Sequence, residues 1–395
     1  MRIILVSFIA FLLLAACQKS PAEFLGKYDL VLEGLKRYSE GELEVVGEPG
    51  DYFGRLHFKG ERERTFALGL EYGDADSLAF VLPGGGYLRL KQQAEQWQGQ
   101  FKYFGLVAQI SGRKVGPASA SLQALVGLKP LAIGRISTGK EESFPCYDAQ
   151  RQILYFTRDS RIYYSHQLKD ETWGQPQLIS FSANFNDSAP ALSPDGTQLL
   201  FTSNRICYLT EARKKNLWVV KRTPEGWGIP RCLPAPVNID SLGEYHGSVA
   251  HSGRYYFVSY LRPGGYGRSD LYVAEQNPQS NDFRVENLGP KINTDKSEAD
   301  VFIDPAERYL LFASTDREES YGQDDIYISF NQVEGWSDPV NLGPLVNSFA
   351  YDYGAWVDAA NGFLYFNSYR RGTSDIYRIP LRDVDALRHL LLRSP

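Results

Sequence analysis

The chain has 395 residues and a formal net charge of −5 at pH 7. This mildly acidic balance gives no reason to expect a nucleic-acid partner, because proteins that bind nucleic acid carry basic surfaces. Tyr, Phe, Val and Ile occur in short bursts separated by Gly, Pro, Asn and Asp, a pattern typical of an all-β protein.

Residues 1–16 predict a signal peptide, since Arg2 precedes an apolar run that is too short to span a bilayer as a mature helix. The following Leu-Ala-Ala-Cys resembles the lipobox of bacterial lipoproteins, which implies lipidation of Cys17. An ordinary signal peptide with a chance Cys is the alternative. In lipoproteins an Asp after the Cys favours retention in the inner membrane, so Gln18 favours the outer membrane. We therefore expect a protein anchored to the membrane through Cys17 on the periplasmic side of the bacterial envelope.

Residues 17–39 are expected to form the lipidated amino terminus and a linker, although Leu25–Tyr38 also fits a helix or a first strand. Residues 40–116 contain short apolar or alternating segments separated by turn residues, which predict a small antiparallel β meander or barrel. Its interior could hold a ligand or be filled by side chains. Residues 117–129 are expected to be a connector with some helical character.

From residue 130 to 381 one pattern occurs five times. Each unit has a polar turn, an aromatic-rich strand that ends in Phe, a polar stop with Arg, and a second strand around Tyr or Trp. Repeats with several short strands each predict a β-propeller, with five blades or alternatively six. The last unit lacks its final strand, which Pro130–Ile136 could supply to close a five-bladed ring. Residues 382–395 predict a helical tail. The repeated Phe residues are Phe156, Phe201, Phe257, Phe312 and Phe366.

The second unit carries Ser193-Pro194-Asp195-Gly196 and a strand ending at Phe201, and later units carry Asp-Ile-Tyr strands. These features resemble the WD-like propeller repeat of the TolB family over about residues 134–380. The Ser-Pro-Asp-Gly turn is clean only in this unit. The resemblance implies a protein-interaction platform of the bacterial envelope.

An acidic residue precedes the strand expected to line the axis in every unit. If these acids point into one channel mouth, they could bind a ligand there together with His246. Two carboxylates could also hydrolyse a glycosidic bond, with Glu244, Glu298 and Asp352 as candidate catalytic acids. The alternative, favoured by repetition in every unit, is that each acid accepts hydrogen bonds from backbone amides. The acidic residues are Glu142, Asp187, Glu244, Glu298 and Asp352.

An Arg follows each Phe strand, and in three units an Asp opens the next strand: Asp270, Asp325 and Asp375. Such pairs could staple the hairpin of a blade. Gly- and Tyr-rich loops at residues 262–268 and 320–323 are candidates for recognition, or else flexible turns. The repeated Arg residues are Arg158, Arg205, Arg262, Arg317 and Arg370.

Cys207 and Cys232 fall in one repeat unit and could form a disulfide, which the sequence leaves open. Cys146 is expected in the core. The five histidines form no metal-ligand pattern and no phosphate loop occurs, so neither a metal nor a cofactor is expected.

These features favour a binding module that recognises an envelope protein or a cell-wall component. The alternative is a propeller hydrolase that acts on glycans or peptides.

Overall fold

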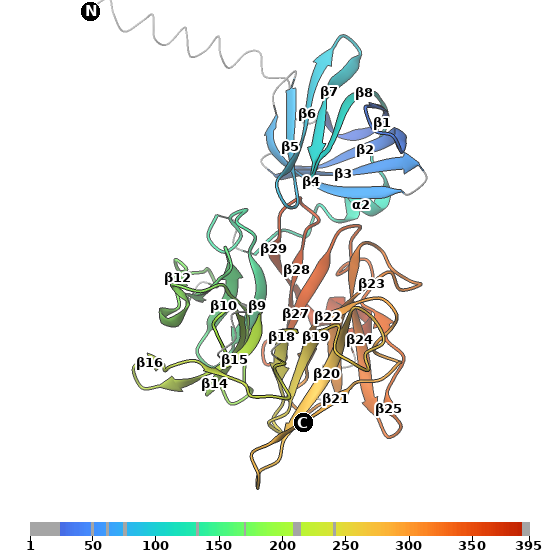
Figure 1. Ribbon diagram of the computed structural model, residues 1–395. Coiled ribbons are helices and arrows are strands. Elements are labelled where there is room, and N and C mark those ends of the chain that lie inside the picture. The colour runs from blue at the N-terminus through green and yellow to red at the C-terminus, as the bar shows by residue number, and fades with distance from the viewer. Residues whose placement is uncertain are drawn as a thin grey trace, which may run out of the picture. The chain divides into compact units, whose positions relative to one another are not determined.

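The computed structural model describes residues 24–388, apart from residues 49–50, 61–62, 74–76, 132–133, 170, 208–214 and 240–241. The predictions for the signal peptide and for Cys17 fall outside these residues. The chain divides into two compact units, Met1–Leu128 with Arg370–Thr373, and Lys129–Tyr369 with Ser374–Pro395. Both are built from β-strands (Figure 1). Within the described part of the chain, no helix is long and apolar enough to span a membrane.

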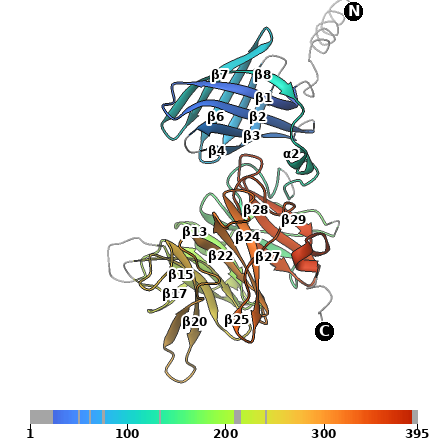
Figure 2. The same cartoon turned by 90° about the vertical axis from the view of Figure 1, so that its right-hand side faces the viewer.

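The first unit contains a closed antiparallel barrel of eight strands, in which each strand pairs with the next and β8 pairs with β1 (Figure 2). Side chains alternate between the interior and the surface: Tyr28, Leu30 and Leu32 of β1 are buried, whereas Asp29 and Val31 are exposed. Buried Leu, Phe, Tyr and Trp side chains from all eight strands pack together inside. The interior is therefore a filled core. The strands are β1 Gly26–Glu33, β2 Tyr38–Glu48, β3 Asp51–Gly60, β4 Arg64–Gly73, β5 Ser77–Leu82, β6 Gly86–Gln93, β7 Gln96–Tyr103 and β8 Leu106–Gly116.

The barrel begins earlier in the chain than expected. Of the two structures left open for residues 25–38, the strand is observed, because GKYDLVLE alternates apolar and polar side chains and buries the apolar ones. The β domain therefore starts before residue 40. The connector at residues 117–129 contains one short helix, α2 Ala120–Ala124.

The second unit is a five-bladed β-propeller, as predicted. The innermost strands of the five sheets are β9, β13, β18, β22 and β27, each of which contacts the innermost strand of the next blade, and β27 contacts β9. The strands are β9 Ser143–Asp148, β10 Ile153–Arg158, β11 Arg161–His166 and β12 Gln177–Leu178 in blade 1; β13 Asp187–Leu192, β14 Gln198–Ser203, β15 Asn216–Thr223, β16 Gly226–Trp227 and β17 Arg231–Cys232 in blade 2; β18 Gly243–Val249, β19 Tyr255–Tyr260, β20 Ser269–Gln276 and β21 Phe283–Asn287 in blade 3; β22 Glu298–Ile303, β23 Tyr309–Thr315, β24 Asp324–Gln332, β25 Gly335–Trp336 and β26 Val340–Asn341 in blade 4; and β27 Asp352–Asp358, β28 Phe363–Ser368 and β29 Asp375–Pro380 in blade 5.

Blade 5 has three strands, and the segment before blade 1 takes the place of its fourth. In each of the other blades, an apolar residue at the outer edge donates its amide to a carbonyl near the start of the third strand. Leu131 makes the equivalent bond to Ile376 of β29, at 2.7 Å. The predicted segment thus joins blade 5 to blade 1, and Ile136 from the same segment packs in one cluster with Tyr365 and Ile376 of blade 5. The equivalent bonds run from Ile179 to Ile162, Leu233 to Leu217, Leu288 to Leu271 and Leu342 to Ile326.

Two further predictions concern the edges of the propeller. The tail begins with a short 3-10 helix, η3 Leu381–Asp383, and Leu387 beyond it is fully buried. Residues 389–395 lie outside the described part.

Cys207 and Cys232 form a disulfide with their Cα atoms 5.6 Å apart, which settles a pairing that the sequence left open. Cys146 is buried and free, and burial raises the pKa of its thiol.

Candidate functional site

The innermost strand of every blade is bent by a β-bulge where it reaches the propeller axis. The register shifts there in all five blades, and one residue per bulge has a positive φ angle. Four of these five residues are not glycine, so the backbone is held in a conformation that L-residues rarely adopt. The bulges direct one residue per blade towards the axis, where they line a cavity of about 30 Å³. They are Phe144, Ala189, His246, Asp300 and Gly354.

The predicted acidic residues lie two positions before these bulge residues and do not line that cavity. All five are fully buried. Glu298 shows their common environment: it accepts hydrogen bonds from the backbone amide of Thr294 at 3.0 Å and from the Thr294 hydroxyl at 2.7 Å. Ser314 donates a further bond at 3.2 Å, and Arg317 forms an ion pair at 3.2 Å.

The other four acids have similar surroundings. Glu142 accepts bonds from Thr138 and pairs with Arg158 at 2.8 Å. Asp187 forms a two-pronged pair with Arg205 at 2.5 and 2.8 Å. Glu244 accepts the amide of Ile239 and the hydroxyl of Ser259, and Asp352 accepts the amide and hydroxyl of Ser348. Burial raises the pKa of Glu244 to about 7, although Arg262 and these hydrogen bonds oppose the shift. Glu142, Glu244, Glu298 and Asp352 therefore join the start of their blades to the segment that enters each one, and Asp187 joins the start of its blade to Arg205.

The predicted pairing of the repeated Arg residues with Asp270 and Asp325 is wrong. Arg262 pairs with Glu244 at 3.5 Å, and Arg317 pairs with Glu298. These two guanidinium groups also lie over a Phe and a Tyr ring of their own blades, as Arg262 does over Phe257 at 5.4 Å. Arg262 and Arg317 therefore hold the buried acids Glu244 and Glu298 in place. Asp270 and Asp325 have different hydrogen-bond partners.

Asp270 and Asp325 hold the two Gly- and Tyr-rich loops in place. Asp270 accepts hydrogen bonds from the amides of Tyr266 and Gly267, at 2.6 and 3.0 Å. Asp325 accepts the amide of Tyr321 at 2.6 Å in the next blade. Gly267 has no room for a side chain, because a Cβ there would lie 2.3 Å from the Lys296 carbonyl oxygen. The loops are thus fastened to the body of the propeller.

The same loops expose aromatic rings. Tyr266 and Tyr321 are each 50% exposed, and Tyr351, on the segment that enters blade 5, is 37% exposed. Their backbone is fixed, so the rings are presented with little conformational entropy left to lose on binding. Tyr and Trp side chains in such positions commonly dominate the energetics of protein interfaces.

His246 is the one predicted site residue that lines the axial cavity. Its Nδ1 lies against a carboxyl oxygen of Asp300 in the next blade. Phe144 covers its ring with centroids 4.3 Å apart. Phe144 also contacts Tyr353, and Tyr353 stacks with Tyr369. An aromatic arc that includes His246 therefore crosses this end of the channel.

A larger cavity of about 250 Å³ lies at the turns where the innermost strands end. Phe302 and Trp356 line both this cavity and the axial one, with ring centroids 5.2 Å apart. No group of three or more His, Cys, Asp or Glu residues that could hold a metal occurs in the described part of the chain.

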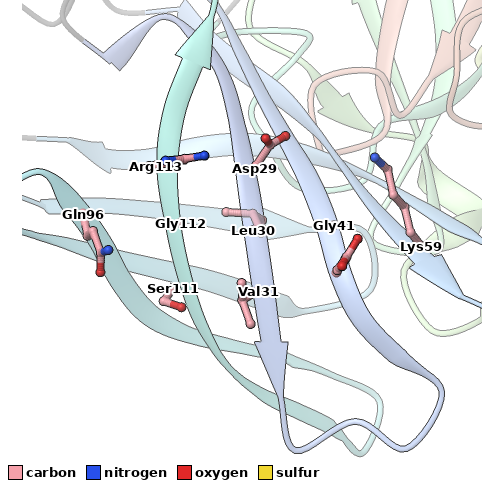
Figure 3. A pocket seen from close by; sticks show the side chains of 10 residues that line it. Asp29, Leu30, Val31, Gly41, Lys59, Gln96, Ser111, Gly112 and Arg113 are labelled. Carbon is pink, nitrogen blue, oxygen red and sulfur yellow. The ribbon is translucent and has the colours of Figure 1, made fainter.

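The barrel carries a groove of its own, of about 510 Å³, on its outer surface across β1. Figure 3 shows Asp29 and Val31 of β1 between Arg113 on β8 and Lys59 on β3. Lys59 is paired with Glu42 at 2.7 Å. The groove is polar and carries charges of both signs.

Two features of the propeller were not predicted from the sequence. One is the bulge residue of each blade, which stands two positions after the acid. The other is a buried Asn that follows the outer edge in three blades: Asn293 accepts the amide of Leu271 at 2.7 Å and donates to its carbonyl at 2.9 Å. Asn238 and Asn347 do the same in their blades. The recurrence of Asn-Thr or Asn-Ser with its Asn five residues before an acid, at Asn293 and Asn347, was the available signal.

No family model matches this chain, and none of the curated proteins matches it. Solved structures do match. A TolB-type protein of Agrobacterium tumefaciens has 15% sequence identity over 62% of this chain and 78% of its own, with a TM-score of 0.41. TolB of Acinetobacter baumannii has 11% identity over 85% and 78%, with a TM-score of 0.38. The arabinanase Arb43A of Bacillus subtilis has 9% identity over 60% and 93%, with a TM-score of 0.37. What this chain has in common with them is the β-propeller fold.

Proposed function

We propose that this chain is a non-enzymatic recognition module of the bacterial envelope, anchored by a lipid at Cys17 and facing the periplasm. Its propeller binds another envelope protein or a cell-wall component. The binding surface is the end of the propeller that carries the loops at residues 262–268 and 320–323. No cofactor is required for this role.

The observation that carries the proposal is the exposure of Tyr266 and Tyr321 on loops that Asp270 and Asp325 hold in place. An exposed ring on a fixed loop adds contact area at low entropic cost. The two loops occupy equivalent positions in adjacent blades, so one partner can contact both.

The surroundings of the carboxylates favour recognition over hydrolysis. Glycoside hydrolysis needs two carboxyl groups that reach the substrate from a pocket. Glu244, Glu298 and Asp352 are each fully buried and bonded to the segment that enters their own blade. These bonds support a structural role for the acids, and Glu142 makes the equivalent bond to Thr138 in blade 1.

The test is site-specific photo-cross-linking in intact cells, with p-benzoylphenylalanine placed at Tyr266 or Tyr321. The control position is the fully exposed Val333. Val333 follows the last residue of β24 and Tyr321 precedes the first, so the two positions lie at opposite ends of this strand. We expect the same adduct from both Tyr positions and none from Val333. Failure of both Tyr positions to give an adduct, or an equal yield from Val333, would overturn the assignment of this surface.

The anchor has a separate test. Cys17→Ser should abolish incorporation of an alkyne-labelled fatty acid, and the parent chain should incorporate it. A parent chain that takes up no label contradicts the lipid anchor but leaves the binding surface standing.

A further inference from the structure

The two halves of the barrel differ sharply in charge. Residues 26–76, which span β1 to β4, contain twelve acidic and seven basic residues, whereas residues 77–116, which span β5 to β8, contain one acidic and five basic residues. The acidic residue of the second half is Glu95, in the turn between β6 and β7. One side of this small barrel is therefore basic although the whole chain is acidic.

The basic residues of the second half are exposed, and all except Lys114 lie on the outward face of the barrel; Lys114 is the register partner of the buried Tyr28. Arg89 and Lys91 lie on β6, Lys102 on β7, and Arg113 and Lys114 on β8. Strand register places Gln100 and Gln109 in one row with Arg89, and Gln98 and Ser111 in one row with Lys91. We call this outward surface of β6, β7 and β8 the basic face. The neutral residues in these two rows are amides and a hydroxyl, and the row of Lys102 holds Tyr87 and Val107, so none of them adds negative charge.

Some acidic residues of the first half of the barrel are paired with basic residues of the same half. Glu42 pairs with Lys27 at 3.0 Å and with Lys59 at 2.7 Å. In contrast, among the described residues no ion pair involves Arg89, Lys91 or Lys102. The groove in Figure 3 marks the border, since Asp29 of β1 and Arg113 of β8 are register partners there.

An apolar tip adjoins the basic face. Phe104, in the turn between β7 and β8, is 77% exposed and has a φ angle of 41°. A bulky residue at positive φ is uncommon in a two-residue turn, where Gly or Asn is favoured. Its ring lies against the turn between β5 and β6, at Gly84. Lys102 is two residues away from this tip on the same hairpin.

The chain also restricts where the barrel can lie. β1 begins at Gly26, nine residues after Cys17, and nine fully extended residues span at most about 30 Å. If Cys17 is lipidated, the barrel is therefore held close to the bilayer. A single acyl signal binds membranes reversibly, and a basic patch on the same protein strengthens the attachment.

We infer that the basic face of the barrel, with Phe104 at its edge, binds the surface of a bilayer that contains anionic phospholipids. This inference relies on the lipid anchor of the proposed function to bring the barrel close to a bilayer. The binding itself depends only on residues of the barrel. Phosphate headgroups pair with Arg89, Lys91 and Lys102, and the Phe104 ring enters the interface between headgroups and acyl chains. Each basic residue near such a surface contributes about a fivefold increase in binding.

The test uses the mature chain, residues 17–395, with Cys17→Ser so that no lipid is attached. Binding is measured by co-sedimentation with vesicles of pure phosphatidylcholine or with vesicles that contain about 30% phosphatidylglycerol. We expect at least tenfold tighter binding to the anionic vesicles, and loss of this preference in about 0.5 M salt. Equal binding to the two kinds of vesicle would overturn the inference.

Matched variants assign the effect to the face. R89Q/K91Q/K102Q should weaken binding to anionic vesicles at least tenfold, whereas K36Q/R37Q/R64Q removes three exposed charges from the other half and should leave binding within about twofold. Phe104→Ser should weaken binding to both kinds of vesicle. Equal losses in the two triple variants, with unchanged circular dichroism, would show that net charge alone acts and would refute the basic face.

The vesicle assay is independent of the proposed function. It uses an unlipidated chain, so it can succeed even if Cys17 carries no lipid in cells. It involves no protein partner, so it can also fail while cross-linking at Tyr266 succeeds. Binding to a soluble polyanion but not to anionic vesicles would overturn the bilayer as the partner.

Discussion

Glu298→Gln distinguishes a structural carboxylate from a catalytic one. The wild-type carboxylate accepts hydrogen bonds from the Thr294 amide, the Thr294 hydroxyl and Ser314, and it pairs with Arg317. Removing one partner of a buried ion pair costs about 3–5 kcal/mol, because the other charge stays buried. Gln retains one acceptor oxygen, and burial of the charged form already raises the pKa of Glu298, so some of that cost disappears. We expect the free energy of unfolding to fall by about 2–4 kcal/mol.

The assay is urea unfolding of the propeller followed by tryptophan fluorescence. Glu334→Gln is the charge-matched control, because Glu334 is exposed in the turn between β24 and β25; it should change stability by less than about 0.5 kcal/mol. Hydrolysis of cell-wall glycans is measured in parallel, and we expect none from the parent chain or from either variant. Unchanged stability of the Glu298→Gln variant, together with loss of an activity present in the parent, would refute the structural assignment.

Three further predictions follow from the propeller. The disulfide closes a loop with a sequence separation of 25, so replacing both Cys207 and Cys232 by Ser should lower the unfolding free energy by about 3–4 kcal/mol; a change below about 1 kcal/mol in chemical denaturation would contradict this. Burial raises the pKa of Asp324 to about 6, so the folded state holds a proton between about pH 4 and 6 that the unfolded state has lost, and stability falls as the pH rises through this window. Asp324→Asn should therefore reduce this slope by the share that Asp324 contributes and add up to about 3 kcal/mol at pH 8, as measured by urea midpoints between pH 4 and 8; a slope equal to that of the parent chain would disprove it. Gly322→Ala places a Cβ about 2.3 Å from the Ser348 carbonyl oxygen and should displace the loop of Tyr321, which hydrogen exchange would detect as faster exchange of its amide. Wild-type protection of that amide would argue against a fastened loop.

Much of the fold could be predicted because each blade repeats strong local signals. The Phe strand and the Tyr or Trp strand are buried on both faces, so their apolar runs are visible in the sequence, and Phe156, Phe201 and Phe312 are fully buried. The closing segment could also be found, since the last unit lacked a strand and Pro130–Ile136 was unassigned. The first barrel strand was harder to assign, because Leu25–Tyr38 is also compatible with a helix.

The site was less predictable, because spacing along the chain does not reveal direction in space. The acids were placed correctly at the start of each innermost strand, but the bulge that follows turns the next residues towards the axis and leaves the acids buried behind them. A bulge has no clear sequence signature when its positive-φ residue is Phe144, Ala189 or His246. The partners of Arg262 were likewise ambiguous, since Asp270 and Glu244 are both acidic neighbours in the same blade.

The bond between Leu131 and Ile376 means that the propeller's wall includes residues from before its first repeat. A truncated chain that began at Ser143 would keep all five repeats but would leave blade 5 with a bare outer edge and an unsatisfied carbonyl. Exposed strand edges invite pairing between molecules. Such a fragment should therefore self-associate. A fragment that begins at Lys129 retains the bond between Leu131 and Ile376 and should stay monodisperse.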